Sequence, residues 1–203
     1  MHIDIQYLPS LEYCAVTFAE PQIEFEVYEH FPKQTYRNRS YILGANGVEL
    51  LSIPIIQSVS GKQLTKDVQI DYSQDWIRKH KGAIQAAYGK APFFEHVEPF
   101  IDQIFAKKSK FLVDLNIQFL NTIARFLQKK PQFSFTETFH EAPVNSLWNV
   151  IDSKKEYSTR NIYNPVAYRQ CFGTEFVANL SVLDLIMNYG IESREILMKS
   201  LNK

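Results

Sequence analysis

The stretch KQTYRNRSYILGANGVELLSIPI, residues 33–55, places a strong turn signal between two runs of β-prone residues. Asn46-Gly47 is a dipeptide that favours a two-residue type I′ turn, because both central residues of that turn need positive φ. A turn at this point pairs Tyr41 with Ser52 across an antiparallel ladder. The stretch therefore predicts a β-hairpin with a defined register.

Alternation along this hairpin separates an apolar face from a polar face. The apolar face, which we expect in the core, carries Ile42, Leu51, Ile53 and Ile55. The polar face carries Arg37, Arg39, Tyr41 and Ser52. Two guanidinium groups about 7 Å apart suit a carboxylate or a phosphate, since the planar fork of arginine makes bidentate hydrogen bonds. The alternative is a solvated strand face whose arginines pair with nearby glutamates.

Length and composition predict one domain that spans residues 1–203. The chain has 203 residues, of which 45% are hydrophobic, enough to bury one sizeable core. Lys+Arg and Asp+Glu both number 22, so no overall field favours nucleic acid or an anionic membrane. The N-terminal MHIDIQYLPS lacks the features of a signal peptide, and no apolar run approaches the about 20 residues that span a bilayer. We expect a cytoplasmic protein with no nucleic-acid partner and no membrane insertion.

Familiar cofactor and metal motifs are absent from the sequence. The chain contains no GxGxxG fingerprint, no Walker loop and no GxSxG elbow. Its five histidines show no HxH, HExxH or paired i, i+4 spacing. Cys14 and Cys171 are too few and too far apart for a disulfide framework, and Cys171 has no histidine or acid at a recognisable local spacing. We predict no cofactor, no metal and two reduced thiols.

Apolar spacing and capping residues predict a mixed α and β fold. Strands at residues 3–6 and 23–28 flank a helix from Ser10 to about Ala19, and this β-α-β order permits a Rossmann-like parallel start. Later helices are expected at about 74–89 with Ser73 as N-cap, from Pro92, at about 110–128, from Ser181 to near Gly190, and from Ser193. The predicted fold is a small sheet with the Asn46-Gly47 hairpin, packed by four to six helices.

Residues 131–161 lose this periodicity, although FSFTETF within them could form a strand. Long irregular segments in compact domains are often lids or binding loops. Lys154 and Lys155 either cover an anionic substrate there or form a solvated charge pair.

His80 is the histidine most favourably placed for chemistry. The helix at about 74–89 carries on one face Trp76, His80, Ile84 and Ala87. Beside the charge of Lys79, His80 could act as a general base or donate a hydrogen bond to an anion. The alternative is a partly buried histidine that bonds a backbone carbonyl.

Two further polar residues have structural interpretations. Asn116 interrupts the apolar side of the helix at about 110–128, and a buried amide must be paired, so we expect it to bond a neighbouring element. Asp184 follows Ser181 by three residues, a spacing that predicts a capping box at the start of a helix.

Several motifs together resemble the WbqC-like proteins of bacteria. The resemblance is carried by Tyr36-Arg37-Asn38-Arg39, Trp76, Lys79-His80, Tyr88-Gly89, Pro92-Phe93-Phe94, Asp114-Leu115-Asn116 and NLSVLDL at residues 179–185. It covers essentially the whole chain. The chain departs from the family at its first strand, where many members have a segment like HQPNYLP. Here Ile3 stands at the histidine position, and His2 is one residue out of register, which points it to the other face of a strand.

The resemblance implies a transferase of O-antigen or surface-polysaccharide biosynthesis that moves an acyl or aminoacyl group onto an activated or amino sugar. Its partner would be a small molecule, a sugar or nucleotide-sugar. In this interpretation Arg37 and Arg39 hold a phosphate or carboxylate, while His80, beside Lys79, moves a proton. The side chains that orient polar groups are Tyr36, Asn38, Tyr168 and Gln170, the last two through the Y-x-Q pattern of the family.

The alternative is a non-catalytic metabolite-binding or scaffold protein of the same pathway. The displaced histidine and the lack of a nucleophile and base at a recognisable spacing favour this alternative.

Overall fold

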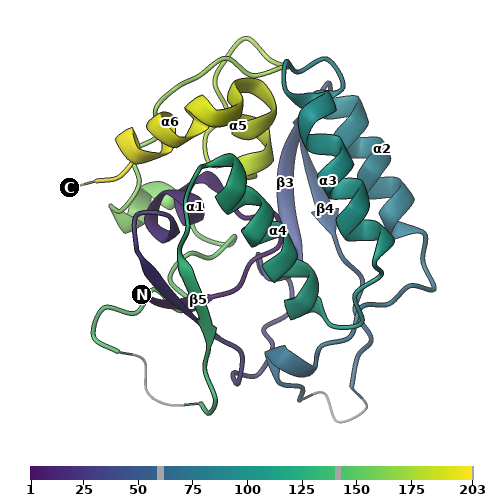
Figure 1. The fold of residues 1–203 in the computed structure, drawn as a ribbon, viewed down its shortest axis with the longest axis vertical. Helices are drawn as coiled ribbons and strands as arrows, with labels where there is room; N and C mark the ends of the chain where they lie inside the picture. Colours follow the sequence, from purple (N-terminus) through teal and green to yellow (C-terminus); the bar gives the residue numbers. More distant parts are fainter. Residues whose placement is uncertain (59–61, 140–142, 203) are drawn as a thin grey trace.

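The computed structural model describes residues 1–58, 62–139 and 143–202 (Figure 1), so residues 140–142 of the irregular segment lie outside the described part. Its strands are β1 (His2–Asp4), β2 (Gln22–Glu26), β3 (Arg39–Gly44), β4 (Gly47–Ser52) and β5 (Gln132–Phe135). Its α-helices are α1 (Leu11–Thr17), α2 (Trp76–Tyr88), α3 (Phe94–Ala106), α4 (Leu112–Phe126), α5 (Val182–Tyr189) and α6 (Ser193–Lys199). The predicted mixed α and β fold is confirmed.

A three-stranded parallel sheet opens the fold. Its strand order is β1-β2-β5, and α1 connects its first two strands. The side chain of Ser10 caps α1 by accepting a hydrogen bond from the N–H of Tyr13 at 3.3 Å, which satisfies one of the free N–H groups of the first turn. The predicted β-α-β start with parallel strands is confirmed, and β5 confirms a strand within FSFTETF.

The two faces of this sheet differ in polarity. One face is apolar and carries Ile3, Ile23, Phe25, Phe133 and Phe135. The other, which we call the polar sheet face, carries His2, Asp4, Gln22, Glu24, Glu26, Gln132 and Ser134. Parallel sheets are normally apolar on both faces. Asp4 and Glu26 are nevertheless buried, so this face requires polar partners from elsewhere in the chain.

The predicted hairpin forms with a different turn and a different register. Strands β3 and β4 pair with Arg39 opposite Ser52, so the predicted register was wrong by two residues. Gly47 has a φ of 111°, whereas Asn46 does not have positive φ. The turn is therefore not type I′, and glycine at the fourth position is typical of a type I turn. Because side chains alternate with a period of two, the shift keeps Ile42 on the buried face, as predicted.

Helix α2 packs against β3 through its predicted apolar face, in which Trp76 and Ile84 are buried. It begins later than predicted, at Trp76, with Asp75 at the N-cap. The predicted cap, Ser73, was wrong because its N–H donates to Oδ1 of Asp71 at 2.8 Å. That local bond holds Ser73 in the preceding turn.

Helix α4 runs between β5 and the β3-β4 hairpin in Figure 1. Its predicted apolar stripe is buried at Leu112, Leu115, Phe119 and Ile123. The side-chain amide of Asn116 donates to the backbone carbonyl of Arg37 at 2.8 Å, which confirms the predicted bond to a neighbouring element. Helix α3 packs beside α4 and begins at Phe94 rather than at Pro92.

Helix α5 begins at the predicted cap, since the Ser181 side chain accepts from the N–H of Leu183 at 3.3 Å. The capping box was wrong, because the N–H of Ser181 donates to the carbonyl of Tyr41 at 2.7 Å and not to Asp184. The start of α5 is therefore tied to β3, and the Asp184 carboxylate is left for other partners.

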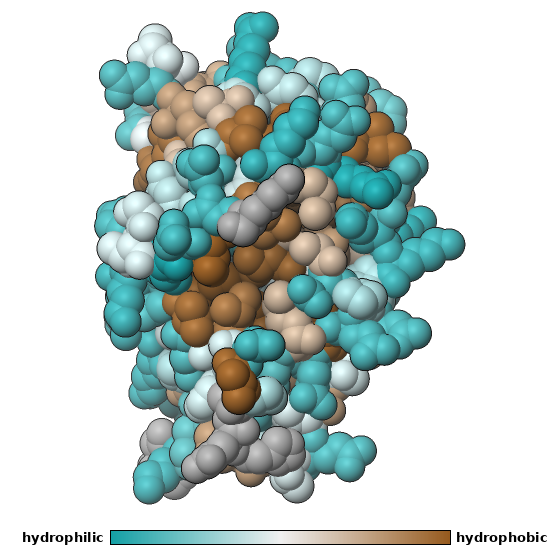
Figure 2. Space-filling view, turned by 90° about the vertical axis from the view of Figure 1, so that its left-hand side faces the viewer, coloured by the Kyte–Doolittle hydropathy of each residue, from teal (hydrophilic) through white to brown (hydrophobic). Residues whose placement is uncertain are grey.

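The side of the molecule that faces left in Figure 1 exposes an apolar area framed by hydrophilic side chains (Figure 2). Helices with the length and apolar character needed to cross a membrane are absent from the described residues.

Substituting Gly47 by alanine should lower the free energy of unfolding by about 1 to 2 kcal/mol, because a side chain at positive φ is strained. Gly82 provides the control: it lies inside α2, and an added Cβ would meet no atom within 4 Å. Gly82→Ala should stabilise the protein by about 0.5 to 1 kcal/mol. Urea denaturation measures both changes, and a Gly47→Ala variant that is as stable as the parent would contradict the described hairpin turn.

Candidate functional site

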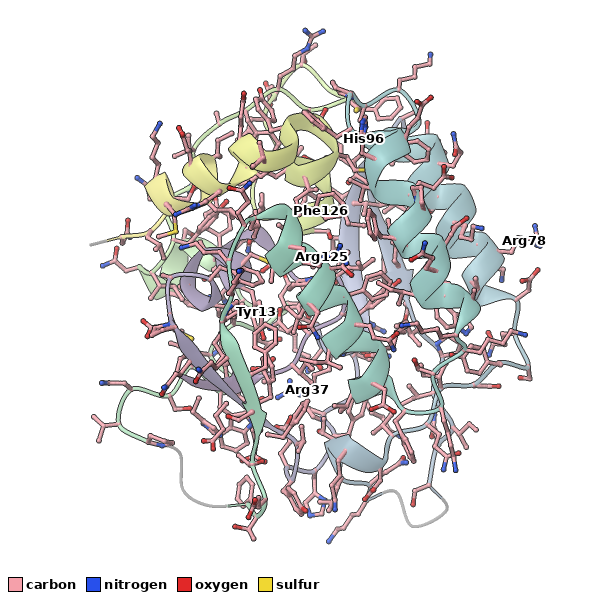
Figure 3. All side chains as sticks on the ribbon, viewed as in Figure 1. Tyr13, Arg37, Arg78, His96, Arg125 and Phe126 are labelled. Carbon is pink, nitrogen blue, oxygen red and sulfur yellow. The ribbon has the colours of Figure 1, made fainter. Side chains whose placement is uncertain are left out.

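Arg37 lies inside the molecule rather than on an open strand face. Its guanidinium makes a bidentate pair with Glu29, with Nη2 at 2.9 Å from Oε2, and its Nη1 lies 3.7 Å from Oδ2 of Asp4. Nη2 also donates to the side chain of Asn149 at 2.8 Å. In Figure 3 Arg37 lies well inside the outline, whereas Arg78 projects from α2 at its edge. We call Asp4, Glu29 and Arg37 the Arg37 ion cluster.

Burial and pairing shift the pKa values within this cluster. Burial raises the pKa of Glu29, and the Arg37 charge opposes this shift. Burial lowers the pKa of Arg37, but Asp4 and Glu29 outweigh it and raise that pKa above its ordinary value. Arg37 is therefore a permanent cation whose fork is occupied by internal carboxylates.

The other residues of the YRNR segment also have internal contacts. The Tyr36 ring packs edge-on against Tyr41, with centroids 6.0 Å apart. The amide of Asn38 donates to the carbonyl of Ile53 at 2.9 Å. Arg39 is half-buried, and its Nε has no hydrogen-bond partner within the described residues. Because Arg37 precedes β3, the alternation that aligned it with Arg39 does not apply to it.

His80 is enclosed by aromatic rings. Its Nδ1 lies 2.9 Å from the hydroxyl of Tyr7, and its ring centroid lies 5.1 Å from that of Trp76 and 6.5 Å from that of Phe105. Burial lowers the pKa of His80 to about 4, although a hydrogen bond with the backbone of Ser52 opposes the shift. His80 is therefore neutral at pH 7 and only 4% exposed. The neighbouring Lys79 is exposed to solvent.

Tyr168 and Gln170 meet at one buried carboxylate. The Tyr168 hydroxyl and the Gln170 amide donate to Oδ2 of Asp184 at 2.6 and 2.9 Å. Burial raises the pKa of Asp184, and these two hydrogen bonds oppose that shift. Gln170 also exchanges hydrogen bonds with the backbone of Val177, so its polar atoms are occupied. It borders a hollow of about 380 Å³ that Lys90 and Arg169 also line.

The structure thus distributes the sequence-predicted site over several places. The Arg37 ion cluster, the His80 aromatic enclosure and the Asp184 carboxylate have no residue in common. None of the predicted residues lines a hollow of about 680 Å³ between α2 and α3, which we call the α2–α3 hollow. Of the three basic residues that line the α2–α3 hollow, Arg78 and Lys81 pair with Asp75 and Asp102, and Lys108 is the third.

Residues 143–152 cover the polar sheet face and supply the partners that it requires. The N–H of Leu147 donates to the carbonyl of His2 at 2.9 Å, and the N–H of Asn149 donates to Oδ1 of Asp4 at 3.1 Å. The Asn149 side chain accepts from Arg37 in addition. This segment is therefore held over the strands by the Arg37 ion cluster.

A hollow of about 380 Å³, which we call the sheet-face hollow, lies between this segment and the strands. It is lined by Met1, His2, Gln22, Ile23, Glu24, Ser134, Pro143 and Asn145. The side chains of Gln22 and Glu24 have no hydrogen-bond or ion-pair partner among the residues that the structure describes. Because no described residue occupies these two side chains, we take this hollow as the candidate site.

Three residues that the sequence interpretation left out of the site meet beside this hollow. Nδ1 of His2 lies 2.8 Å from the hydroxyl of Ser146, and Nε2 of His2 lies 3.4 Å from Oε2 of Glu26. His2 was passed over as out of register, and Ser146 lies in an aperiodic segment 144 positions away. The one signal in the sequence was the alternation of polar and apolar residues along β1 and β2, which places His2 and Glu26 on the same face of the sheet.

Comparison with known proteins identifies a family but no individual relative. A family model described as the WbqC-like protein family matches residues 6–167. No curated protein and no solved structure matches the chain. The matched range includes Arg37, His80 and Ser146, whereas His2 and Asp184 lie outside it.

Replacing His80 with glutamine should reduce the loss of stability in acid. The folded pKa of about 4 lies below the ordinary 6.5, so the unfolded chain binds a proton between these values that the folded chain does not. Stability conferred by neutral His80 is complete above pH 6.5 and is lost as the pH falls. We expect the free energy of unfolding, measured with urea, to fall between pH 7 and pH 4.5 by about 2 kcal/mol more in the parent than in the variant. Equal losses would show that His80 is solvated and free to transfer protons.

Proposed function

This chain belongs to the WbqC-like protein family, and we propose that it is a sugar-modifying transferase of O-antigen or surface-polysaccharide biosynthesis. It moves an acyl or aminoacyl group onto an amino sugar, free or in activated form. The observation that carries the proposal is the sheet-face hollow, which lies beside the buried His2 and the half-buried hydroxyl of Ser146. It is lined by the Glu24 carboxylate and the Gln22 amide, which have no partner among the described residues.

The polar groups of this hollow suit an amino sugar. The Glu24 carboxylate can accept hydrogen bonds from an ammonium group or from adjacent hydroxyls, and the Gln22 amide can both donate and accept. Ser134 adds a hydroxyl, and its register position beside Glu24 places the two groups on neighbouring strands. A carboxylate selects for a cationic amine over a neutral amide, so the acceptor binds Glu24 through its nitrogen.

The size of the hollow suits one sugar ring. Its volume of about 380 Å³ lies near the lower end of the about 300 to 1,000 Å³ typical of ligand sites. A nucleotide attached to the sugar would extend beyond the hollow toward solvent.

In this proposal Arg37 does not contact the substrate but holds the segment that covers the site. Its hydrogen bond to Asn149 holds residues 143–152 over the strands. The proposed chemistry does not use the other predicted roles, which stay predictions. They are proton transfer by His80 and direct substrate contacts by Arg39, Tyr36, Asn38, Lys79, Tyr168 and Gln170.

Glucosamine or galactosamine, free or linked to a nucleoside diphosphate, should raise the melting temperature of the protein and bind measurably in calorimetry. Glu24→Gln should weaken the binding about tenfold, because a hydrogen bond to a charged group contributes about 1.5 to 3 kcal/mol. Incubation with the amino sugar and an acyl thioester should yield the N-acylated sugar, detected by mass spectrometry.

The matched control is Glu98→Gln, which removes a carboxylate from the α2–α3 hollow and should leave the affinity unchanged. Equal weakening by both variants, or no binding of any amino sugar, would refute the proposed site. Binding without product would favour a non-catalytic metabolite-binding protein instead.

A further inference from the structure

We infer that Ser146 is an acyl-accepting nucleophile, with His2 as its general base and Glu26 as the carboxylate that orients the histidine. The donor would be an activated acyl ester or thioester. This inference rests on the proposed function for the identity of the acceptor, but the nucleophile can be tested without any sugar.

The distances are those of a nucleophile and its base. Oγ of Ser146 lies 2.8 Å from Nδ1 of His2, within the reach that proton transfer requires. The opposite ring nitrogen, Nε2, lies 3.4 Å from Oε2 of Glu26. With the proton on Nε2 facing this carboxylate, the lone pair of Nδ1 points to the serine hydroxyl. The Nε2–Oε2 contact is an ion-pair distance without a hydrogen bond, and the serine hydroxyl also donates to the carbonyl of His2 at 3.4 Å. The tautomer with a free lone pair on Nδ1 is therefore part of the inference.

Glu26 is placed so that only one of its oxygens faces the histidine. The side chain is 0% exposed, and its Oε1 accepts hydrogen bonds from the N–H of Tyr28 at 2.6 Å and from the hydroxyl of Thr136 at 2.9 Å. Oε2 has no hydrogen-bond partner in the described part of the chain. When His2 becomes an imidazolium, its Nε2 lies 3.4 Å from this oxygen. A buried carboxylate fixed in this way stabilises the imidazolium that arises during catalysis.

Ser146 is the half-buried member of the set, which is the position that a nucleophile needs. The N–H of Trp148 donates to its Oγ at 3.1 Å, and this donor stabilises negative charge on the oxygen as the proton leaves. The residues next to it, Pro143 and Asn145, line the sheet-face hollow together with His2. An acyl group on Ser146 would therefore lie at the edge of the hollow.

The acceptor and the base are neighbours on the sheet. His2 of β1 lies in register with Glu24 of β2, and Glu24 lies in register with Ser134 of β5. An amine held by Glu24 is thus one strand away from the imidazole. The same imidazole can serve the attack of Ser146 and then the attack of the amine.

The reaction proceeds in two balanced steps. In the first, the Ser146 oxygen bonds to the acyl carbon, its proton moves to Nδ1 of His2, and the donor's alcohol or thiol leaves with that proton. In the second, the sugar ammonium held by Glu24 releases one proton to solvent, and the resulting amine attacks the serine ester. His2 takes a second proton from the nitrogen and returns it to Oγ of Ser146. The products are the N-acyl sugar and the original enzyme.

A fluorophosphonate probe tests the nucleophile, since the serine oxygen displaces fluoride and the adduct survives mass spectrometry. The protein should carry its affinity tag at the C-terminus, because the α-ammonium of Met1 bonds the carbonyl of Gln22 at 2.8 Å beside the site. We expect one adduct, located at Ser146 by peptide mapping. Ser146→Ala should abolish it, and His2→Gln should slow it at least about 100-fold.

Two further variants separate chemistry from structure. Ser73→Ala removes a hydroxyl from the lining of the α2–α3 hollow and should label at the parental rate. Glu26→Gln should lower the labelling rate about tenfold or more and leave the affinity for the amino sugar unchanged, a split that simple loss of structure would not produce.

Absence of an adduct at Ser146, or labelling that is insensitive to His2→Gln, would overturn the inference. Ser146→Ala should still bind amino sugars with parental affinity, which shows that it folds. Labelling of Ser146 in a protein that binds no amino sugar would support the nucleophile and refute the proposed acceptor.

Discussion

The buried ion pair between Arg37 and Glu29 joins three parts of the chain that are distant in sequence. Glu29 follows β2, Arg37 precedes β3, and Asn149 and Trp148 bring residues 143–152 to the same charges. Buried charges cost several kcal/mol each unless they are paired and hydrogen-bonded. Loss of any one partner leaves an uncompensated charge in the interior. The position of the segment that carries Ser146 therefore depends on this pair.

The polar sheet face explains why such a segment is needed. A parallel sheet with carboxylates on one face cannot pack that face against an apolar layer without large desolvation costs. Residues 143–152 solve this problem with backbone N–H groups and short polar side chains, which bond His2 and Asp4 directly. His2 belongs to both sets, because it bonds the covering segment and also lines the sheet-face hollow.

The sequence interpretation was most successful where a pattern is local. Ser10 and Ser181 cap helices as predicted, and the face of α2 with Trp76 and Ile84 is buried. Helical spacing placed His80 on that face, but spacing does not reveal whether the space opposite is a cleft or a ring of aromatic side chains. Likewise, alternation correctly assigned Ile42 to the core but was extended to Arg37, which lies before the strand begins. A period describes an element only within its bounds.

The sequence by itself determined the mixed α and β class, the parallel start, the hairpin, the main helices and the resemblance to the WbqC-like family, because each follows from neighbouring residues. Only the tertiary structure decided which polar groups meet. Arg37 pairs with Glu29 and bonds Asn149, and His2 lies against Ser146, 144 positions away, and against Glu26 of the neighbouring strand. No periodicity links such residues, since their contact results from how sheet, hairpin and covering segment pack together.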